Sequence, residues 1–302
     1  MKISDNTRGL LYAVAAGFLW SILAVIIKVL LHWIPPKTIA WGRFCVAFGF
    51  LFIYFIIYRR KQLKIFLRPP VLVILSALAL GSNYILFMEG INITTPNNAA
   101  IFIQVGPLLL AVIGFIFYKE KLRPVQIAGF AIAIVGFLFF YKDQFRNLFS
   151  QTGNYNIGVL YIILAGVMWA IYSVLQKELV KKYVADDLNL INFGLPALLL
   201  LGGADIHKLS EAPWYAIGIL IFLGLNTLLA YRFLSLALKY TEANKISIIL
   251  TSNPTITFIA MAILTSLEVS WIEGEIFALL SIVGAILVIL GAVIVSVFNE
   301  RK

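Results

Sequence analysis

The sequence predicts an all-α polytopic membrane protein with ten transmembrane helices, arranged as two inverted five-helix repeats. Three observations lead to this prediction: the composition, a series of long apolar stretches, and a similarity between the two halves of the chain. Of the 302 residues, 62% are hydrophobic and only 13% are charged. A soluble domain is about half apolar and about a quarter charged, so the composition indicates a membrane protein.

Ten stretches of the chain are apolar enough to be interpreted as membrane-crossing helices, each of which needs about 20 residues. The first follows Lys2 and Arg8 as a signal peptide would, but it is long enough to span, and we interpret it as an uncleaved helix. The seventh is short and is interrupted by Asn189, Asn192 and Pro196. The predicted spans are residues 9–31, 37–58, 71–90, 96–118, 124–141, 157–180, 188–203, 213–238, 243–267 and 271–297.

The placement of basic residues predicts the orientation of these helices. With a cytoplasmic N-terminus, 17 of the 24 lysines and arginines fall on the cytoplasmic side, as the positive-inside rule requires. The net charge of +10 is then a signal of topology and not of nucleic-acid binding. Because the C-terminal Arg301 and Lys302 belong to the same side, the number of crossings is even and both termini are expected in the cytoplasm.

An internal repeat divides the chain into residues 1–150 and 151–302. Residues 9–30 align with residues 158–179 at an offset of 149, with ten of 22 positions identical. The identities include Gly17/Gly166, Trp20/Trp169 and Lys28/Lys177, and an offset of 147 then pairs Tyr84/Tyr231, Thr94/Thr241 and Pro107/Pro254. Five helices per half is an odd number, so the halves would insert with opposite orientations, an architecture common in secondary transporters.

Several short motifs give the chain a resemblance to a known family. They are A-G-x-x-W in the first helix of each half, Arg43-Phe44 in the second helix, Thr-x-x-Asn followed by Pro107 or Pro254, and the late Glu120 and Glu268. Together they resemble the EamA branch of the drug/metabolite transporter superfamily over essentially the whole chain. The resemblance implies ten helices, cytoplasmic termini and a central cavity lined mainly by helices 1, 3, 4, 6, 8 and 9. It also implies export of small metabolites such as amino acids, although members import or exchange solutes as well.

Pro107 and Pro254 lie about a dozen residues into the fourth and ninth predicted helices, near the middle of the membrane. A proline there removes a backbone hydrogen bond and clashes with the carbonyl four residues earlier, so both helices are expected to kink. Gln104 and Asn253 stand close to the two kinks. The pair of kinked helices would shape a solute site, and the alternative is a packing kink satisfied by neighbouring helices.

Polar and aromatic side chains inside other predicted helices extend this candidate cavity, since polar groups in hydrocarbon require a cavity or a partner. In the sixth helix Trp169, Tyr172, Ser173 and Gln176 recur on one helical face. Such a lining suits a neutral or zwitterionic solute with an apolar part, and hydrogen bonding between helices is the alternative. The remaining candidates for the cavity are Trp20, Asn83, Tyr84, Asn226 and Tyr231.

Five ionisable residues within the spans are candidate gate residues. Arg43 and Glu89 lie near the outer side and are expected to form an ion pair, with proton coupling through Glu89 as the less favoured interpretation. Arg232 could attract a carboxylate or extend to the interface. Lys28 and Lys177 occupy equivalent positions near opposite membrane faces, which favours a role in gating, although extension to the interface explains each lysine alone.

The sequence predicts a secondary transporter that moves a small metabolite across the cytoplasmic membrane by alternating access. With a single cysteine (Cys45), two histidines (His32 and His207) and no catalytic spacing, we expect no enzyme activity, metal site or cofactor. The expected partners are a small-molecule substrate and the lipid bilayer, and a monomer is compatible with the sequence. The alternatives are a flippase for a lipid-linked solute and a non-transporting scaffold or sensor.

Overall fold

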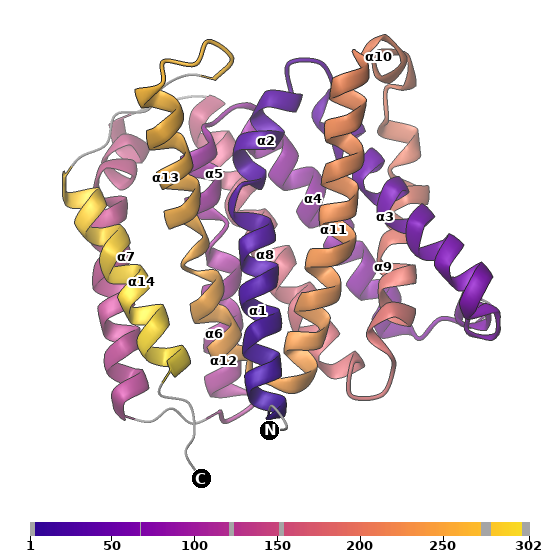
Figure 1. Cartoon of the computed structure of the whole chain (residues 1–302), viewed down its shortest axis with the longest axis horizontal. Helices are drawn as coiled ribbons and strands as arrows, with labels where there is room; N and C mark the ends of the chain where they lie inside the picture. Colours follow the sequence, from indigo (N-terminus) through magenta and orange to yellow (C-terminus); the bar gives the residue numbers. More distant parts are fainter. Residues whose placement is uncertain (1–3, 67, 121–123, 151–153, 273–278, 298–302) are drawn as a thin grey trace.

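A computed structural model describes residues 4–66, 68–120, 124–150, 154–272 and 279–297, and these residues contain helices and connections but no strand (Figure 1). The all-α prediction is therefore confirmed. The α-helices are α1 (Asp5–Ser21), α2 (Leu23–Leu30), α3 (Pro36–Tyr58), α4 (Val71–Asn92), α5 (Pro96–Phe102), α6 (Val105–Ile116), α7 (Pro124–Ser150), α8 (Asn154–Leu179), α9 (Ala185–Leu199), α10 (Ile206–Glu211), α11 (Trp214–Tyr240), α12 (Ala243–Leu250), α13 (Asn253–Ser266) and α14 (Leu279–Val297). Short 3₁₀ helices are η1 (Arg60–Phe66) and η2 (Leu201–Gly203).

Seven helical stretches in the described residues are long and apolar enough to cross a membrane. They are Asp5–Leu30, Pro36–Tyr58, Val71–Asn92, Pro96–Ile116, Asn154–Leu179, Trp214–Tyr240 and Ala243–Ser266. Shorter apolar segments, Ile127–Gly136 and Ile282–Gly291, lie within α7 and α14. The predicted seventh span corresponds to the 15-residue α9, and part of the predicted tenth span falls outside the described residues. The count of ten crossings remains a prediction.

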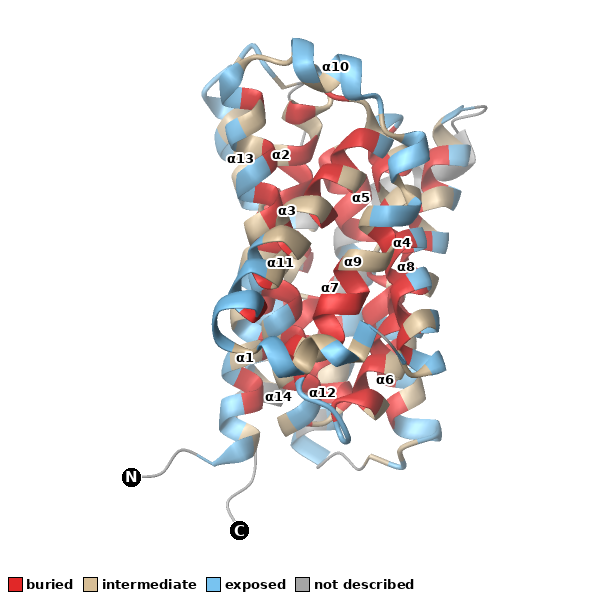
Figure 2. Cartoon of the chain, turned by 90° about the vertical axis from the view of Figure 1, so that its right-hand side faces the viewer, coloured by how far each residue is buried: buried red, intermediate tan, exposed pale blue. Residues whose placement is uncertain are grey.

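The outer surface of the helices is apolar, as expected for contact with lipid. Phe18 of α1 is 64% exposed, Ile57 of α3 is 60% exposed and Val293 of α14 is 49% exposed. Figure 2 shows buried residues along the interior of the helix assembly and exposed ones on its outside. Large apolar side chains at such positions would be unfavourable in water but are at no disadvantage against acyl chains.

Prolines and a polar cap mark where several helices begin. α3, α5 and α7 each start at a proline, where the missing N–H costs little because the first turn has no intrahelical acceptor. Thr95 caps α5, since its hydroxyl oxygen accepts a hydrogen bond from the backbone N–H of Asn98 at 3.3 Å. The predicted starts at residues 37, 96 and 124 agree with these helices to within one residue.

Pro107 and Pro254 each follow a short interruption of the helix, and the kinks that the sequence predicts at these positions remain a prediction. α5 ends at Phe102 and α6 begins at Val105, while α12 ends at Leu250 and α13 begins at Asn253. Pro107 and Pro254 therefore lie in the first turns of α6 and α13, where a proline is tolerated.

A third interruption, between α1 and α2 at Ile22, has no proline and is not predicted by the sequence. The carbonyl oxygen of Ser21, at the end of α1, accepts a hydrogen bond from the hydroxyl of Thr257 in α13. The repeat-equivalent helix α8 continues without a break from Asn154 to Leu179. This break therefore coincides with a hydrogen bond from another helix, α13, and not with a helix-breaking residue in the local sequence.

Helix packing brings the two halves of the chain against each other. α4 packs along α8, α1 packs along α11 and α7 packs along α14. The sequence repeat relates α1 to α8 and α4 to α11, so the first two of these contacts join equivalent partners. The start of α1 and the end of α14 lie at the same end of the molecule, at the bottom of Figure 1.

Close contact between α6 and α8 depends on glycine at Gly106 and Gly166. A Cβ atom added at Gly106 would lie 2.8 Å from the carbonyl oxygen of Gly166, which is backbone and cannot turn aside. Small residues at such crossings let membrane helices approach closely. This contact sets α8 directly beside the interruption between α5 and α6.

We expect Gly106→Ala to lower the free energy of unfolding by about 1–3 kcal/mol, the usual cost of overpacking. Gly49→Ala in α3 is the matched control, because a Cβ at Gly49 would have nothing within 4 Å. Thermal unfolding of the detergent-solubilised variants measures both. Equal melting temperatures for Gly106→Ala and the parent protein would contradict the close packing.

Candidate functional site

A central pocket lies where the three interrupted helices meet the interior of the helix assembly. It contains about 770 Å³ of space that protein atoms leave free, part of it open to solvent. The lining residues are Trp20, Leu23, Ala24, Arg43, Asn83, Tyr84, Phe87, Met88, Ala100, Ile103, Gln104, Pro107, Trp169, Tyr231, Leu250, Asn253, Pro254 and Thr257.

Aromatic rings from both halves of the chain form one wall of the pocket. Trp20 of α1 lies edge-on to Trp169 of α8 at 6.0 Å between ring centroids, and edge-on to Tyr231 of α11 at 5.2 Å. Tyr84 of α4 lies 6.0 Å from Tyr231. These geometries are favourable for aromatic pairs. The pocket therefore has an aromatic wall made of side chains that the sequence pairs across the repeat.

Arg43 of α3 brings a positive charge into the pocket. Its Nε donates a hydrogen bond to the Thr227 hydroxyl at 3.1 Å, and its NH2 group donates to the Tyr84 hydroxyl at 3.2 Å. The guanidinium carbon lies 4.5 Å from the centroid of the Tyr84 ring, a cation–π contact. Arg43 is 3% exposed.

The predicted ion pair between Arg43 and Glu89 is wrong for the described residues: the partners of Arg43 are Tyr84 and Thr227. Glu89 lies five residues after Tyr84 in α4, which places it about 7.5 Å farther along the helix axis. The Arg43 guanidinium therefore contacts α4 at Tyr84, more than one helical turn before Glu89.

Three amide side chains complete the polar part of the pocket. Gln104 donates from Nε2 to the carbonyl oxygen of Ala100 at 3.1 Å, whereas its buried Oε1 has no hydrogen-bond partner among the described residues. Asn83 donates from Nδ2 to the carbonyl oxygen of Ala165 at 2.8 Å, which ties α4 to α8. Asn253 starts α13, and its side chain packs beside Gly17.

The structure places nine of the twelve predicted cavity residues in the pocket lining and three outside it. Gln176 lies about 10 Å farther along α8 than Trp169, since seven residues separate them. There its Nε2 donates to the Ser235 hydroxyl at 2.8 Å, and its Oε1 accepts from Asn192 Nδ2 at 3.1 Å. Of the four residues that the sequence pattern groups on one face of α8, only Trp169 lines the pocket.

The other two residues outside the pocket contribute to packing between helices. Tyr172 is fully buried, with its ring edge-on to that of Tyr231 at 5.4 Å. Asn226 of α11 donates from Nδ2 to the carbonyl oxygen of Leu19 in α1 at 2.8 Å. Asn226 thus forms a hydrogen bond between helices, which is the alternative role that the sequence leaves open.

The repeat-equivalent lysines Lys28 and Lys177 make equivalent contacts at opposite ends of the molecule. The Lys28 ammonium donates to three carbonyl oxygens at the end of α4 and beyond, those of Ile91 (3.1 Å), Asn92 (3.1 Å) and Thr94 (2.7 Å). The Lys177 ammonium donates to the carbonyl oxygen of Thr241 at 3.3 Å. Thr94 and Thr241 are themselves paired by the repeat. Each lysine thus ties two helices of one half to each other.

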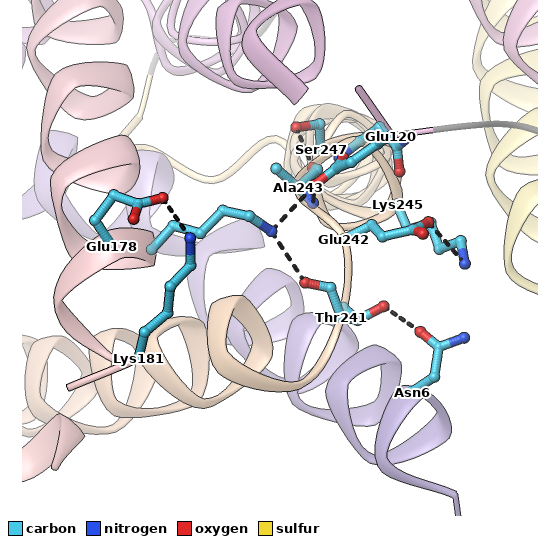
Figure 3. Close-up of polar contacts among 11 residues, drawn as sticks. Asn6, Glu120, Glu178, Lys181, Thr241, Glu242, Ala243, Lys245 and Ser247 are labelled. Carbon is cyan, nitrogen blue, oxygen red and sulfur yellow. Dashed lines mark hydrogen bonds and ion pairs between the residues drawn. The ribbon is translucent and has the colours of Figure 1, made fainter. Parts of the chain in front are cut away.

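Glu120 joins several elements at the lower end of the molecule (Figure 3). Its carboxylate pairs with Lys177 at 3.1 Å and accepts hydrogen bonds from the backbone N–H groups of Ala243 and Asn244, each at 2.9 Å. A carboxylate at these first N–H groups of α12 is favourable because they carry partial positive charge. We call Glu120, Lys177, Thr241 and the first turn of α12 the lower tie. The sequence marks Glu120 only through the family resemblance, because the partners of its carboxylate lie in the other half of the chain.

Arg232, the remaining candidate gate residue, pairs with a carboxylate of the chain itself. Its Nε lies 3.0 Å from Oδ1 of Asp186, at the start of α9, and its side chain is 48% exposed. Arg59 also pairs with this acidic site, at 3.4 Å from Asp187. The structure therefore places Arg232 outside the pocket lining and in an ion-pair cluster next to α9. Among the described residues, no group of three or more potential metal-ligating side chains occurs.

Comparison with known proteins identifies the family. The EamA-like transporter family matches residues 7–142 and again residues 156–297. The chain belongs to this family. Membership confirms the resemblance found in the sequence and identifies the chain as a membrane transporter by family. This EamA-like chain thus carries the family pattern once in each half.

Individual relatives of this EamA-like chain agree with the family match. It is 26% identical over 287 residues to the uncharacterized inner membrane transporter YhbE of Escherichia coli (strain K12), covering 94% of this chain and 89% of that protein. It is 25% identical to an uncharacterized transporter of Haemophilus influenzae, with coverage of 97% and 95%. A solved crystal structure shares the fold, with a TM-score of 0.71, 16% identity and coverage of 97% and 99%.

We expect Glu120→Gln to destabilise the protein far more than Glu178→Gln. Both glutamates pair with lysines at the lower end, but Glu120 is 7% exposed and Glu178 is 43% exposed. Removing one partner of a buried ion pair costs about 3–5 kcal/mol, whereas an exposed pair contributes about 0–1 kcal/mol. Melting temperatures in detergent measure the difference. A similar small change in both variants would mean that the lower tie does not hold these helices together.

Proposed function

We propose that this EamA-like protein is a secondary transporter that moves a small metabolite, such as an amino acid or a similar solute, across the cytoplasmic membrane by alternating access. The central pocket carries the proposal. It receives side chains from both halves of the chain and lies at three helix interruptions, one in α1–α2, one in α5–α6 and one in α12–α13. Solute sites of secondary transporters are commonly formed by interrupted helices near the middle of the membrane.

We further propose that the chain crosses the membrane ten times as two inverted repeats. Seven stretches qualify by length and composition alone, and α7, α9 and α14 would supply the other three. The shared end of the first and last helices supports an even number of crossings. The relative named as an inner membrane transporter supports placement in the cytoplasmic membrane, and the excess of basic residues supports cytoplasmic termini.

The two repeat-equivalent lysines suggest how access could alternate in this proposal. Lys28 and Lys177 hold opposite ends of the helix assembly through carbonyl oxygens of equivalent connections. A rocking motion of one half against the other would loosen contacts at one end while those at the other end persist. Export is the direction that we propose, in line with the family resemblance.

Replacement of a pocket residue should abolish stabilisation by the transported solute. A ligand that binds the folded form raises its melting temperature, and the shift grows with concentration above the dissociation constant. We therefore propose thermal unfolding of the purified protein against amino acids, organic acids, nucleosides and sugars, repeated with Trp169→Ala. A class that stabilises the parent protein should lose its effect in this variant, because Trp169 forms part of the pocket wall.

Trp214→Ala is the matched control, because this tryptophan begins α11 and is 84% exposed. It should leave the solute-dependent shift unchanged. A shift that survives Trp169→Ala would place binding elsewhere and contradict the proposed site.

A further inference from the structure

The positive charge of Arg43 lies in the pocket without an acidic partner. Arg43 is 3% exposed, and no ion pair with Asp or Glu is formed by it within the described residues. In the described part of the chain, the pocket lining also contains no Asp or Glu. By contrast, Lys177 pairs with Glu120 and Arg232 pairs with Asp186. A buried charge in a membrane protein is costly unless it meets a counter-charge or serves a ligand.

The hydrogen bonds of Arg43 leave much of its guanidinium unused. A guanidinium carries five N–H donors, and Arg43 uses two of them, to Thr227 and to Tyr84. Both acceptors are neutral hydroxyls, so they orient the side chain without neutralising it. The remaining three N–H groups can meet the two oxygens of a carboxylate, the anion whose planar geometry a guanidinium matches best.

The fold itself does not require a cation at this position. The repeat offset of 149 residues places Asn192 of α9 opposite Arg43 of α3, and Phe193 opposite Phe44. Asn192 is fully buried and donates a hydrogen bond to Gln176 at 3.1 Å. An uncharged side chain therefore occupies the equivalent position in the second half. The charge therefore belongs to one half only, the half whose second helix reaches the pocket.

The side-chain oxygen of Gln104 is a second polar feature of the pocket that points to a ligand. Gln104 is 3% exposed, and its Oε1 accepts no hydrogen bond from any residue that the structure describes. Because its Nε2 donates to the Ala100 carbonyl oxygen, the amide is oriented with Oε1 as the free atom. A buried acceptor of this kind is favourable only when a ligand or a water supplies a donor.

From these observations we propose that the solute carries a carboxylate, which Arg43 binds, on an apolar or aromatic body. The inference rests on the proposed role of the pocket as the solute site. The body would lie against the Trp20, Trp169 and Tyr231 rings, and a hydroxyl or N–H of the solute would donate to Gln104. Organic cations are disfavoured, since they would meet Arg43 and the described lining residues include no acidic side chain to offset the repulsion.

The test compares acids with their own primary amides, which have nearly the same shape but no charge. The probes are 4-methylpentanoate, 3-phenylpropionate and indole-3-propionate, each against the matching amide, titrated by isothermal calorimetry into the full-length protein. Charge-assisted hydrogen bonds are worth enough that an acid should bind about tenfold to a hundredfold more tightly than its amide. This comparison uses the unmodified protein, so it does not depend on whether a variant folds.

Two variants test whether Arg43 causes the preference for the acid over its amide. Arg43→Gln should remove the difference between acid and amide, and Arg43→Lys, which keeps the charge but loses the planar fork, should retain part of it. Arg232→Gln is the control, since it removes a cation that is outside the pocket and paired with Asp186. It should leave the preference for acids intact.

Each outcome decides the proposal. Preferential binding of an acid that disappears in Arg43→Gln but not in Arg232→Gln supports it. Equal binding of acid and amide, persistence of the preference in Arg43→Gln, or no binding of any carboxylate would overturn it. If a neutral solute binds instead and loses its effect in Trp169→Ala, the carboxylate proposal fails while the proposed transport site stands.

Discussion

The structure depends on one constraint of the membrane interior: every backbone polar group must find a partner there, because no water is available. Most of the helices meet this requirement internally. α1–α2, α5–α6 and α12–α13 are interrupted, and their interruptions converge on the pocket. At one of them, Thr257 of α13 supplies the hydrogen bond that the Ser21 carbonyl accepts. These three breaks in the described helices thus lie beside a cavity and polar side chains, which make irregular backbone tolerable.

The same constraint explains where charged side chains occur. Lys28 and Lys177 bind the carbonyl oxygens that a helix leaves unsatisfied at its end, and Glu120 binds the N–H groups at the start of α12. These charged side chains supply hydrogen-bond partners for backbone groups at the helix ends, which would be costly to bury without partners. Arg43 is the exception within the pocket lining, since its partners there are neutral. Contacts within the protein thus account for the charges at the two ends, and the proposed carboxylate of the solute would account for Arg43.

Much of the fold follows from the sequence because its signals are local. Apolar length and prolines such as Pro36 and Pro96 set the helix starts closely, and the aromatic pair Trp20 and Trp169 stood out through the repeat. Contacts between distant helices could not be read in the same way. The break at Ile22 lies next to a hydrogen bond from α13. The structural role of Glu120 depends on Lys177 and other partners in the second half of the chain. Gln176 lies outside the pocket because it is too far along α8 from Trp169. A pattern of residues on one helical face does not show how far along the helix a pocket extends.

The central claim is that the pocket opens to each side of the membrane in turn, and cysteine accessibility tests it most directly. Cys45 is the only cysteine, so Cys45→Ala provides a background for Asn253→Cys in the pocket lining and for Ser210→Cys on the exposed α10. A membrane-impermeant thiol reagent is applied to vesicles of both orientations. We predict that the cysteine at position 253 reacts from either face, whereas the one at position 210 reacts from one face only. Reaction at position 253 from a single face, or from neither, would contradict alternating access through this pocket.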